Sequence, residues 1–240
     1  LGAHEVTDLA SDSPLEYGAM LRLLVALTHR IVDGPAGNRH RAQLLLQGHF
    51  KPAAVDRYFD QWGERFDLFH PTHPFLQDAA FSLKEPGSVA RLVPQFASGN
   101  NVLLFDHTLD DVPPALTPAE AARALLVHQA YGLCGGQGST SEKYGKHPYL
   151  CDGPAAQGVN VFLRGPSLFH TLLLNTVPYP ARCVPGKPPA DRPAWERDAP
   201  AAPGSYSPDG LLDYLTWPNR SVRLVPEEID GKVVVRTVHV

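Results

Sequence analysis

The chain has 240 residues, 43% hydrophobic and 19% charged, with a net charge of −4 at neutral pH. This composition is typical of a soluble globular protein and excludes a disordered chain, and no apolar run reaches the roughly 18 residues needed to span a bilayer. The 3 cysteines are odd in number and have no Cys-x-x-Cys spacing, which favours reduced thiols in the cytoplasm over a disulfide framework.

Two helices are predicted in the first quarter of the chain. Residues 13–16 (Ser-Pro-Leu-Glu) have the capping-box pattern of a helix start, and Asp33 with the following Gly-Pro ends this helix. The second helix is predicted over residues 51–62, before Gly63. Helical spacing predicts that one stripe of the first helix is buried, consisting of Met20, Leu23, Leu24, Leu27 and Ile31.

An aromatic stretch follows at residues 66–77, where two prolines exclude a regular helix. We expect its phenylalanines to pack in a core rather than to stack on bases. His70 and His73 have a spacing that metal ligands use, but no third ligand lies near them in the sequence. A packed turn is therefore favoured over a metal site.

The middle of the chain is predicted to combine a loop with a third helix. Residues 92–105 are predicted as a loop around Ser-Gly-Asn-Asn, followed by a short apolar run. Residues 117–120 (Thr-Pro-Ala-Glu) form a second capping-box pattern and open a helix that ends near Tyr131. A glycine cluster and a polar loop come next, with Gly132, Gly135, Gly136, Gly138, Lys143, Lys146 and His147.

The last third predicts little regular structure. Residues 159–163 alternate as a strand does, and Ser167 is a candidate cap for a short helix that reaches Leu174. Residues 184–210 are rich in Pro, Ala and Gly, which is typical of a linker without a core. Two alternating segments, 221–224 and 232–238, predict a hairpin around residues 227–231. The expected fold is α+β, mainly helical, with small sheets and long loops.

The glycine cluster has two interpretations. It follows a helix carboxyl end, where the dipole disfavours phosphate, and it matches neither a dinucleotide nor a Walker pattern. One interpretation is a plain helix cap followed by a loop. The other is a backbone that approaches another surface closely, which only glycine allows. Lys143 and Lys146 nearby are candidate nucleic-acid contacts. Because the chain is acidic overall, any DNA contact is local or relies on partner charges.

Six segments, taken in chain order, resemble the amino-terminal part of the CasA family. CasA is the large subunit of the type I-E CRISPR surveillance complex (Cascade). The most distinctive segment is 164–175, and no single segment is diagnostic without the others. The matching segments are residues 21–27, 73–77, 98–105, 132–136, 164–175 and 215–224.

The resemblance implies a DNA-recognition subunit and not an enzyme, with no cofactor, no metal and no catalytic residue. The implied partners are the other Cascade subunits, crRNA, double-stranded target DNA and a recruited helicase-nuclease. CasA inspects duplex DNA for the protospacer-adjacent motif (PAM), largely from the minor groove, and helps to start strand separation. Guide–target pairing then recognises the sequence.

Two sites carry over from the family to this chain. The glycine loop that probes the PAM matches Gly132, Gly135 and Gly136, and this sequence places Cys134 among them. Phe105 matches an aromatic that anchors against the crRNA handle and a neighbouring subunit. The family's lysine finger, glutamine wedge and carboxy-terminal helical bundle have no match, so residues 1–240 are interpreted as the amino-terminal domain alone.

Two other functions remain possible from the residues. One is a scaffold subunit without DNA contact, in which the glycines only cap a helix. The other is a metal-dependent hydrolase that uses His70 or His73 with a partner distant in the sequence. No Gly-x-Ser-x-Gly or other catalytic motif supports the hydrolase.

Overall fold

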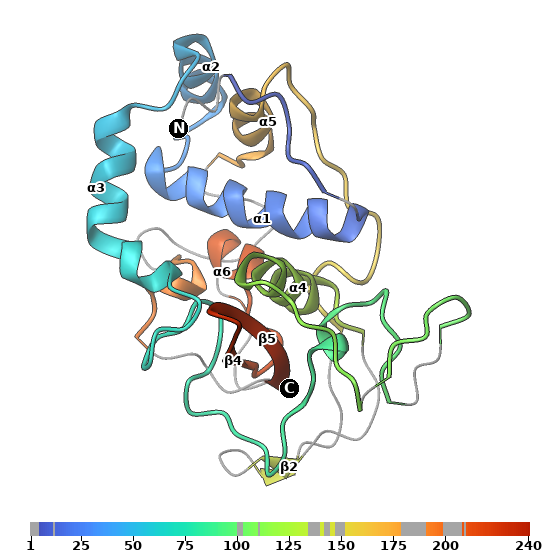
Figure 1. Cartoon of the computed structure of the whole chain (residues 1–240). Coiled ribbons are helices and arrows are strands. Elements are labelled where there is room, and N and C mark those ends of the chain that lie inside the picture. The colour runs from blue at the N-terminus through green and yellow to red at the C-terminus, as the bar shows by residue number, and fades with distance from the viewer. Residues whose placement is uncertain are drawn as a thin grey trace. The chain divides into compact units, whose positions relative to one another are not determined.

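The chain is mixed α and β and mainly helical, as the sequence predicts, and it forms two compact units (Figure 1). Unit 1 consists of Leu1–Glu64, Gly158–Arg197 and Ser207–Trp217; unit 2 consists of Arg65–Gln157, Asp198–Tyr206 and Pro218–Val240. The computed structural model describes residues 5–11, 13–99, 103–109, 111–133, 152–178, 191–198, 208 and 210–240, and the backbone of 140–141 and 145–146.

Unit 1 is a helical cluster built around its longest helix, α1. Ser13 caps this helix by accepting a hydrogen bond from the Leu15 N–H, and α5 packs against it through Leu168 and Leu172. Ser167 caps α5 as predicted, but α2 and α6 were not predicted, because α2 buries no residue and α6 is one short turn. The helices are α1 (Pro14–Ile31), α2 (Asn38–Gln47), α3 (Pro52–Trp62), α5 (Leu168–Asn175) and α6 (Leu211–Leu215), with the 3₁₀ turn η3 (Ala194–Glu196). The 3₁₀ turn η1 (Gly63–Phe66) includes the last residues of this segment of unit 1 and the first of unit 2.

The buried face of α1 differs from the predicted stripe. The five predicted residues are only half-buried, while Leu21, Val25 and the polar Arg22 and His29 are buried. Arg22 donates to the Tyr214 carbonyl at 2.9 Å, and His29 Nε2 accepts from the Val177 N–H at 3.1 Å. Polar groups with such partners bury without a large penalty, so a pattern of apolar residues alone selects the wrong face.

The predicted linker is packed where it is described, at residues 191–198. Trp195 and Glu196 are buried, and Glu196 Oε1 accepts hydrogen bonds from the Tyr58 hydroxyl and from Arg30 Nε, both at 2.7 Å. Asp191 accepts from the N–H groups of Leu212 and Asp213 at the start of α6. The expectation that this stretch builds no core is therefore wrong for these residues, since the buried Trp195 and the hydrogen-bonded carboxylates of Asp191 and Glu196 hold it in unit 1.

Residues 159–163 form no regular strand, which corrects the prediction. The Asn175 side chain instead bonds both backbone groups of Leu163: it accepts from the N–H at 3.0 Å and donates to the carbonyl at 2.7 Å. Val159 and Val161 are exposed, whereas Phe162 packs against the core of unit 1. Burial does not alternate along this segment, and the described residues provide no neighbouring strand that pairs with it.

A buried neutral histidine makes unit 1 sensitive to acid. Burial lowers the pKa of His29 to about 4. The unfolded chain takes up a proton near pH 6.5, while the folded chain resists protonation until about pH 4, so stability falls as the pH falls between these values. We expect this group to remove about 2 kcal/mol of unfolding free energy between pH 7 and pH 5.

Urea unfolding at pH 7 and at pH 5 tests this dependence. The His29→Gln variant should lose about 2 kcal/mol less than the native chain over that interval, whatever its absolute stability. His73→Gln is the matched control, because His73 is exposed. Equal losses for native and His29→Gln chains would contradict the assignment.

Unit 2 contains the sheet and helix α4. The hairpin of β4 (Arg223–Ile229) and β5 (Lys232–His239) was predicted, but the turn is only Asp230–Gly231. Both turn residues have positive φ, as a tight Asp-Gly hairpin turn requires, so the strands pair as far as Ile229 and Lys232, and the predicted loop over 227–231 is too long. The other elements are β1 (Gly87–Ser88), which pairs with β5, η2 (Val89–Leu92), α4 (Pro118–Tyr131), and the paired β2 (Thr140–Ser141) and β3 (Gly145–Lys146).

The core of unit 2 joins α4 to the sheet. Ala121 and Leu125 of α4 pack with Val235 and Val238 of β5, all of them buried. The chain before α4 also pairs with the sheet, since Leu116 and Val235 exchange two backbone hydrogen bonds of 2.9 and 2.8 Å. The segment that precedes α4 and the helix itself are thus both attached to β5, which gives the carboxyl end of α4 a defined position within unit 2.

Candidate nucleic-acid interface

Helix α4 leads directly into the predicted glycine loop. It begins with the predicted capping box: Thr117 Oγ1 accepts from the Glu120 N–H, and the Glu120 carboxylate accepts from the Thr117 N–H at 2.7 Å. That hydrogen bond lowers the pKa of Glu120. The helix ends at Tyr131, and the Gly132 N–H donates to the His128 carbonyl at 3.0 Å. The sequence therefore predicts both ends of this helix correctly.

Two backbone hydrogen bonds join the chain before and after the glycine loop. The Gly153 N–H donates to the Gly132 carbonyl at 2.6 Å, and the Ala155 N–H donates to the Ala130 carbonyl at 2.9 Å. We call residues 130–133 and 152–155 the neck, because the intervening residues 134–151 start and finish there. The neck brings the two ends of the loop together at the carboxyl end of α4.

Glycine at the neck has a steric reason. A Cβ on Gly153 would lie 2.5 Å from the Ala130 carbonyl oxygen, and a Cβ on Gly132 would lie 2.6 Å from the His128 carbonyl oxygen. Both distances are shorter than real Cβ contacts, and both neighbours are backbone atoms that cannot rotate away. Gly132 is thus required by the neck, independently of any contact that it makes with DNA.

Arg220 contacts the last described residue before the loop. Its guanidinium Nη2 donates to the Leu133 carbonyl at 3.0 Å, and the residue is only 4% exposed. Its backbone is held by Gln129 of α4, whose Oε1 accepts from the Arg220 N–H at 2.8 Å and whose Nε2 donates to the Arg220 carbonyl at 2.9 Å. Burial, together with this positive charge, lowers the pKa of His128 to about 4, so the imidazole beside the neck is neutral at physiological pH.

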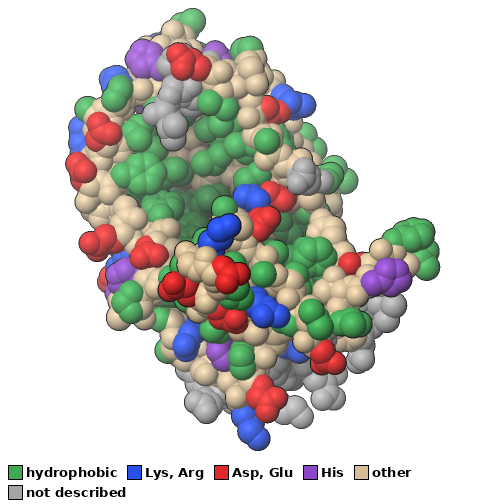
Figure 2. Space-filling view, viewed as in Figure 1, with side chains coloured by type: hydrophobic (Ala, Val, Ile, Leu, Met, Phe, Trp, Pro, Cys, Tyr) green, Lys and Arg blue, Asp and Glu red, His purple; other side chains and the backbone are tan. Residues whose placement is uncertain are grey.

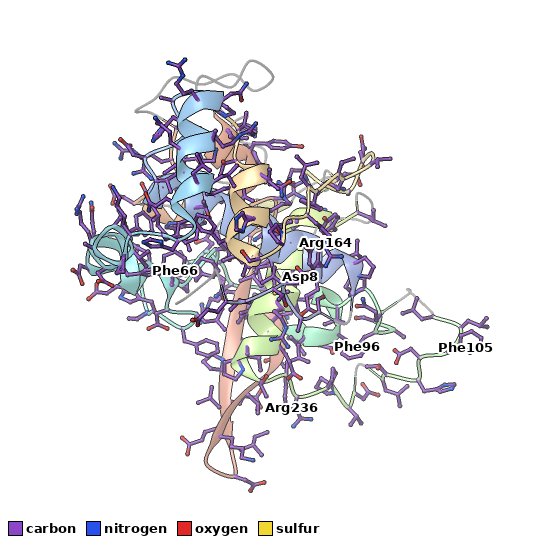
Figure 3. The ribbon with its side chains drawn as sticks, turned by 90° about the horizontal axis from the view of Figure 1, so that it is seen from above. Asp8, Phe66, Phe96, Phe105, Arg164 and Arg236 are labelled. Atoms are coloured by element: carbon purple, nitrogen blue, oxygen red, sulfur yellow. The ribbon has the colours of Figure 1, made fainter. Side chains whose placement is uncertain are left out.

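A second feature of unit 2 is an apolar loop that projects into solvent. Phe105 lies at its end, far from Phe96 at its base (Figure 3), and its side chain is 91% exposed. Figure 2 shows hydrophobic side chains gathered at the tip of this loop. We call it the projecting loop; its exposed apolar residues are Leu104, Phe105, Leu109 and Val112.

Asp106 fixes the base of the tip. Its carboxylate accepts hydrogen bonds from the Ala97 N–H and from the N–H and hydroxyl of Thr108. These hydrogen bonds lower the pKa of Asp106, and the one from Ala97 has the largest effect. The carboxylate thereby ties the two sides of the projecting loop together and leaves the adjacent Phe105 pointing outward. Sequence reasoning proposed Phe105 as a site residue but did not include its apolar neighbours, which lie in a segment without periodicity.

The structure brings together only part of the predicted site. Among the predicted glycine-loop residues, Gly132 lies in the neck, and Lys146 belongs to β3, where only its backbone is described. His70 Nδ1 accepts from the N–H groups of Thr72 and His73 at 3.3 and 3.0 Å, as in the packed turn that was favoured. The remaining predictions lie outside the described residues: Cys134, Gly135, Gly136 and Lys143.

The described part of the chain has neither a metal-like cluster nor a membrane-spanning helix. Within it, no group of three or more His, Cys, Asp or Glu side chains is arranged to hold a metal ion. None of its helices combines the length and the apolar character needed to cross a bilayer.

Comparison with known proteins identifies the family. The model of the CRISPR-associated protein Cse1 family matches residues 1–240. The chain belongs to the Cse1 family. A CasA/Cse1 protein of Thermus thermophilus is 38% identical over 233 residues, which are 95% of this chain and 44% of that protein. The resemblance to CasA is therefore confirmed.

Solved structures of Cse1 proteins agree in fold. Cse1 of Thermobifida fusca superposes with a TM-score of 0.81 at 30% identity, covering 97% of this chain and 44% of that one. A chain of a CRISPR RNA-guided surveillance complex in a pre-nicking state superposes with a TM-score of 0.82 at 31% identity, covering 99% of this chain and 48% of that one. This chain thus spans about half the length of these Cse1 relatives.

Proposed function

We propose that this chain is the PAM-recognising part of the large subunit of a type I-E surveillance complex. Membership of the Cse1 family supports this role, as does the similarity to a chain of an RNA-guided surveillance complex. The proposed partners are the other subunits, crRNA and duplex target DNA. Initial strand separation and docking of a helicase-nuclease are functions that we propose for the whole subunit, including the part that carries a lysine finger and a glutamine wedge in the family. The role is recognition and not catalysis, in a cytoplasmic complex.

The neck is the observation that carries the proposal. It holds a glycine-rich loop at the carboxyl end of a buried helix, where the dipole disfavours phosphate. Contact with base edges is then favoured over contact with the DNA backbone. The minor groove is about 6 Å wide, and a backbone that carries no side chains fits there. Its N–H groups can donate to the acceptors that line the groove floor. Lys143 and Lys146 remain proposed contacts to the flanking phosphates.

The projecting loop supports a second part of the proposal, which is assembly. Four exposed apolar side chains on one short loop are more than scattered surface residues, and such groups usually mark an interaction site. We propose that Phe105 anchors the subunit against the crRNA handle and a neighbouring subunit. A scaffold subunit without DNA contact is the alternative function that this loop alone would favour.

Modified bases distinguish minor-groove recognition from its alternatives. The assembled complex is titrated with duplexes whose PAM purines lack N7, a major-groove atom, or gain or lose the 2-amino group of the minor groove. We expect the 2-amino changes to weaken binding by about tenfold per altered base pair, and loss of N7 to have little effect. The reverse pattern would contradict minor-groove recognition, and no response to either change would favour the scaffold.

A further inference from the structure

We infer that Arg220 and Gly153 act together as a clamp that sets the position of the glycine loop for PAM recognition. The two residues approach the neck from different parts of the chain, Gly153 from beyond the loop and Arg220 from the segment before β4. This inference rests on the proposed function, since it assigns positioning residues to the same loop. Neither residue is proposed to touch DNA.

Arg220 controls the direction in which the chain leaves the neck. Its guanidinium holds the carbonyl of Leu133, the residue immediately before the loop. The exposed Leu133 side chain makes this residue a poor anchor on its own, because 74% of it faces solvent. The reciprocal hydrogen bonds between Gln129 and the Arg220 backbone fix the arginine to the preceding turn of α4. The guanidinium therefore ties the Leu133 carbonyl, the last described group before the loop, to the carboxyl end of α4.

The charge of Arg220 also suits this position. Helix α4 ends at Tyr131, and the last carbonyls of a helix carry a partial negative charge that a cation stabilises. A neutral side chain of similar length would fill the space but would leave the Leu133 carbonyl without this donor. Lysine keeps the charge and one donor direction, although it lacks the planar guanidinium. Lysine should therefore restore part of the function that a neutral residue removes.

Gly153 closes the other side of the clamp. Its N–H donates to the Gly132 carbonyl, and any Cβ would lie 2.5 Å from the Ala130 carbonyl oxygen. Alanine at this position must displace the returning chain from α4, which changes the spacing of the two loop ends. The consequence for the loop should match that of losing the guanidinium, although the two substitutions are chemically unrelated.

The test is target binding by the assembled complex that carries the full-length subunit, on duplexes with and without a PAM. We expect Arg220→Met and Gly153→Ala each to reduce the preference for PAM-containing DNA by about tenfold, the loss of one recognised base pair, with partial recovery in Arg220→Lys. Hydrogen exchange of residues 134–151 should rise in both neck variants. Gly63→Ala is the control, because a Cβ there meets nothing within 4 Å.

Each outcome decides between the clamp and its alternatives. If the loop variant Gly135→Asp loses PAM preference while both neck variants keep it, the clamp is wrong and the proposed function stands. If neither the loop variant nor the neck variants lose it, the proposed function is wrong as well. If the neck variants fail to enter the complex, or lose PAM-containing and PAM-free DNA equally, the residues serve general folding, and the clamp is again overturned.

Discussion

Replacing Phe105 with alanine should weaken entry of this subunit into the surveillance complex by about 30-fold and leave its folding unchanged. The side chain is 91% exposed, so truncation removes almost no contact within the folded chain. Exposed aromatics that become buried at the centre of an interface typically contribute about 2 kcal/mol or more, which corresponds to that factor. Titration of the subunit into a complex that lacks it, with thermal unfolding of the free subunit, measures both effects.

Leu46 provides a matched control for this prediction. Its side chain is 88% exposed on α2, in unit 1, and it is likewise apolar. Leu46→Ala should assemble like the native subunit. If Phe105→Ala assembles normally, the projecting loop is not the anchor, and equal losses in both variants would indicate a general effect of surface hydrophobicity.

Local signals in the sequence predicted the helix boundaries well. The capping box at Thr117 could be predicted because the two residues that it joins, Thr117 and Glu120, are only three positions apart in the sequence. The Ser167 cap is equally local, whereas the hairpin was predicted with too long a turn. Such features depend on backbone groups within one turn of the chain, and tertiary packing has little opportunity to override them.

Features that depend on distant partners were not predicted. The buried face of α1 includes Arg22 because the Tyr214 carbonyl, 192 residues away, accepts its hydrogen bond. Residues 191–198 have a linker-like composition but are anchored by Asp191 and Glu196 to groups on other elements. The spacing of apolar residues does not indicate burial of this kind, because these polar side chains can be buried only where distant groups satisfy their hydrogen bonds.

The candidate site likewise has one part that the sequence indicated and one part that depends on distant partners. The glycine cluster and Phe105 were proposed from the sequence through the family resemblance, and the cluster also from its place after a helix. The neck was not found, because the sequence does not indicate that Gly153 pairs with Gly132 or that Arg220 contacts Leu133. The sequence does not tell which glycines exclude a Cβ, and only the fold separates Gly132 and Gly153, where backbone atoms exclude it, from Gly63, where nothing does.

The largest loss of target binding is expected for Gly135→Asp. An aspartate in the glycine loop adds both bulk and negative charge where the proposal places the backbone in a narrow groove lined by phosphates. Steric exclusion and charge repulsion act in the same direction, so we expect about 100-fold weaker binding to PAM-containing DNA, equivalent to about 2.7 kcal/mol. Gly63→Asp is the matched control, since it adds the same charge in unit 1 at a position with open space.

The most direct test of PAM recognition by this chain is therefore the binding of target DNA, with and without a PAM, by complexes that carry the native subunit, Gly135→Asp or Gly63→Asp. The account predicts that Gly135→Asp assembles normally and loses only the PAM-dependent binding, while Gly63→Asp matches the native complex. Native-like binding by Gly135→Asp would contradict the account, and would leave the glycines as a helix cap in a subunit that acts as a scaffold.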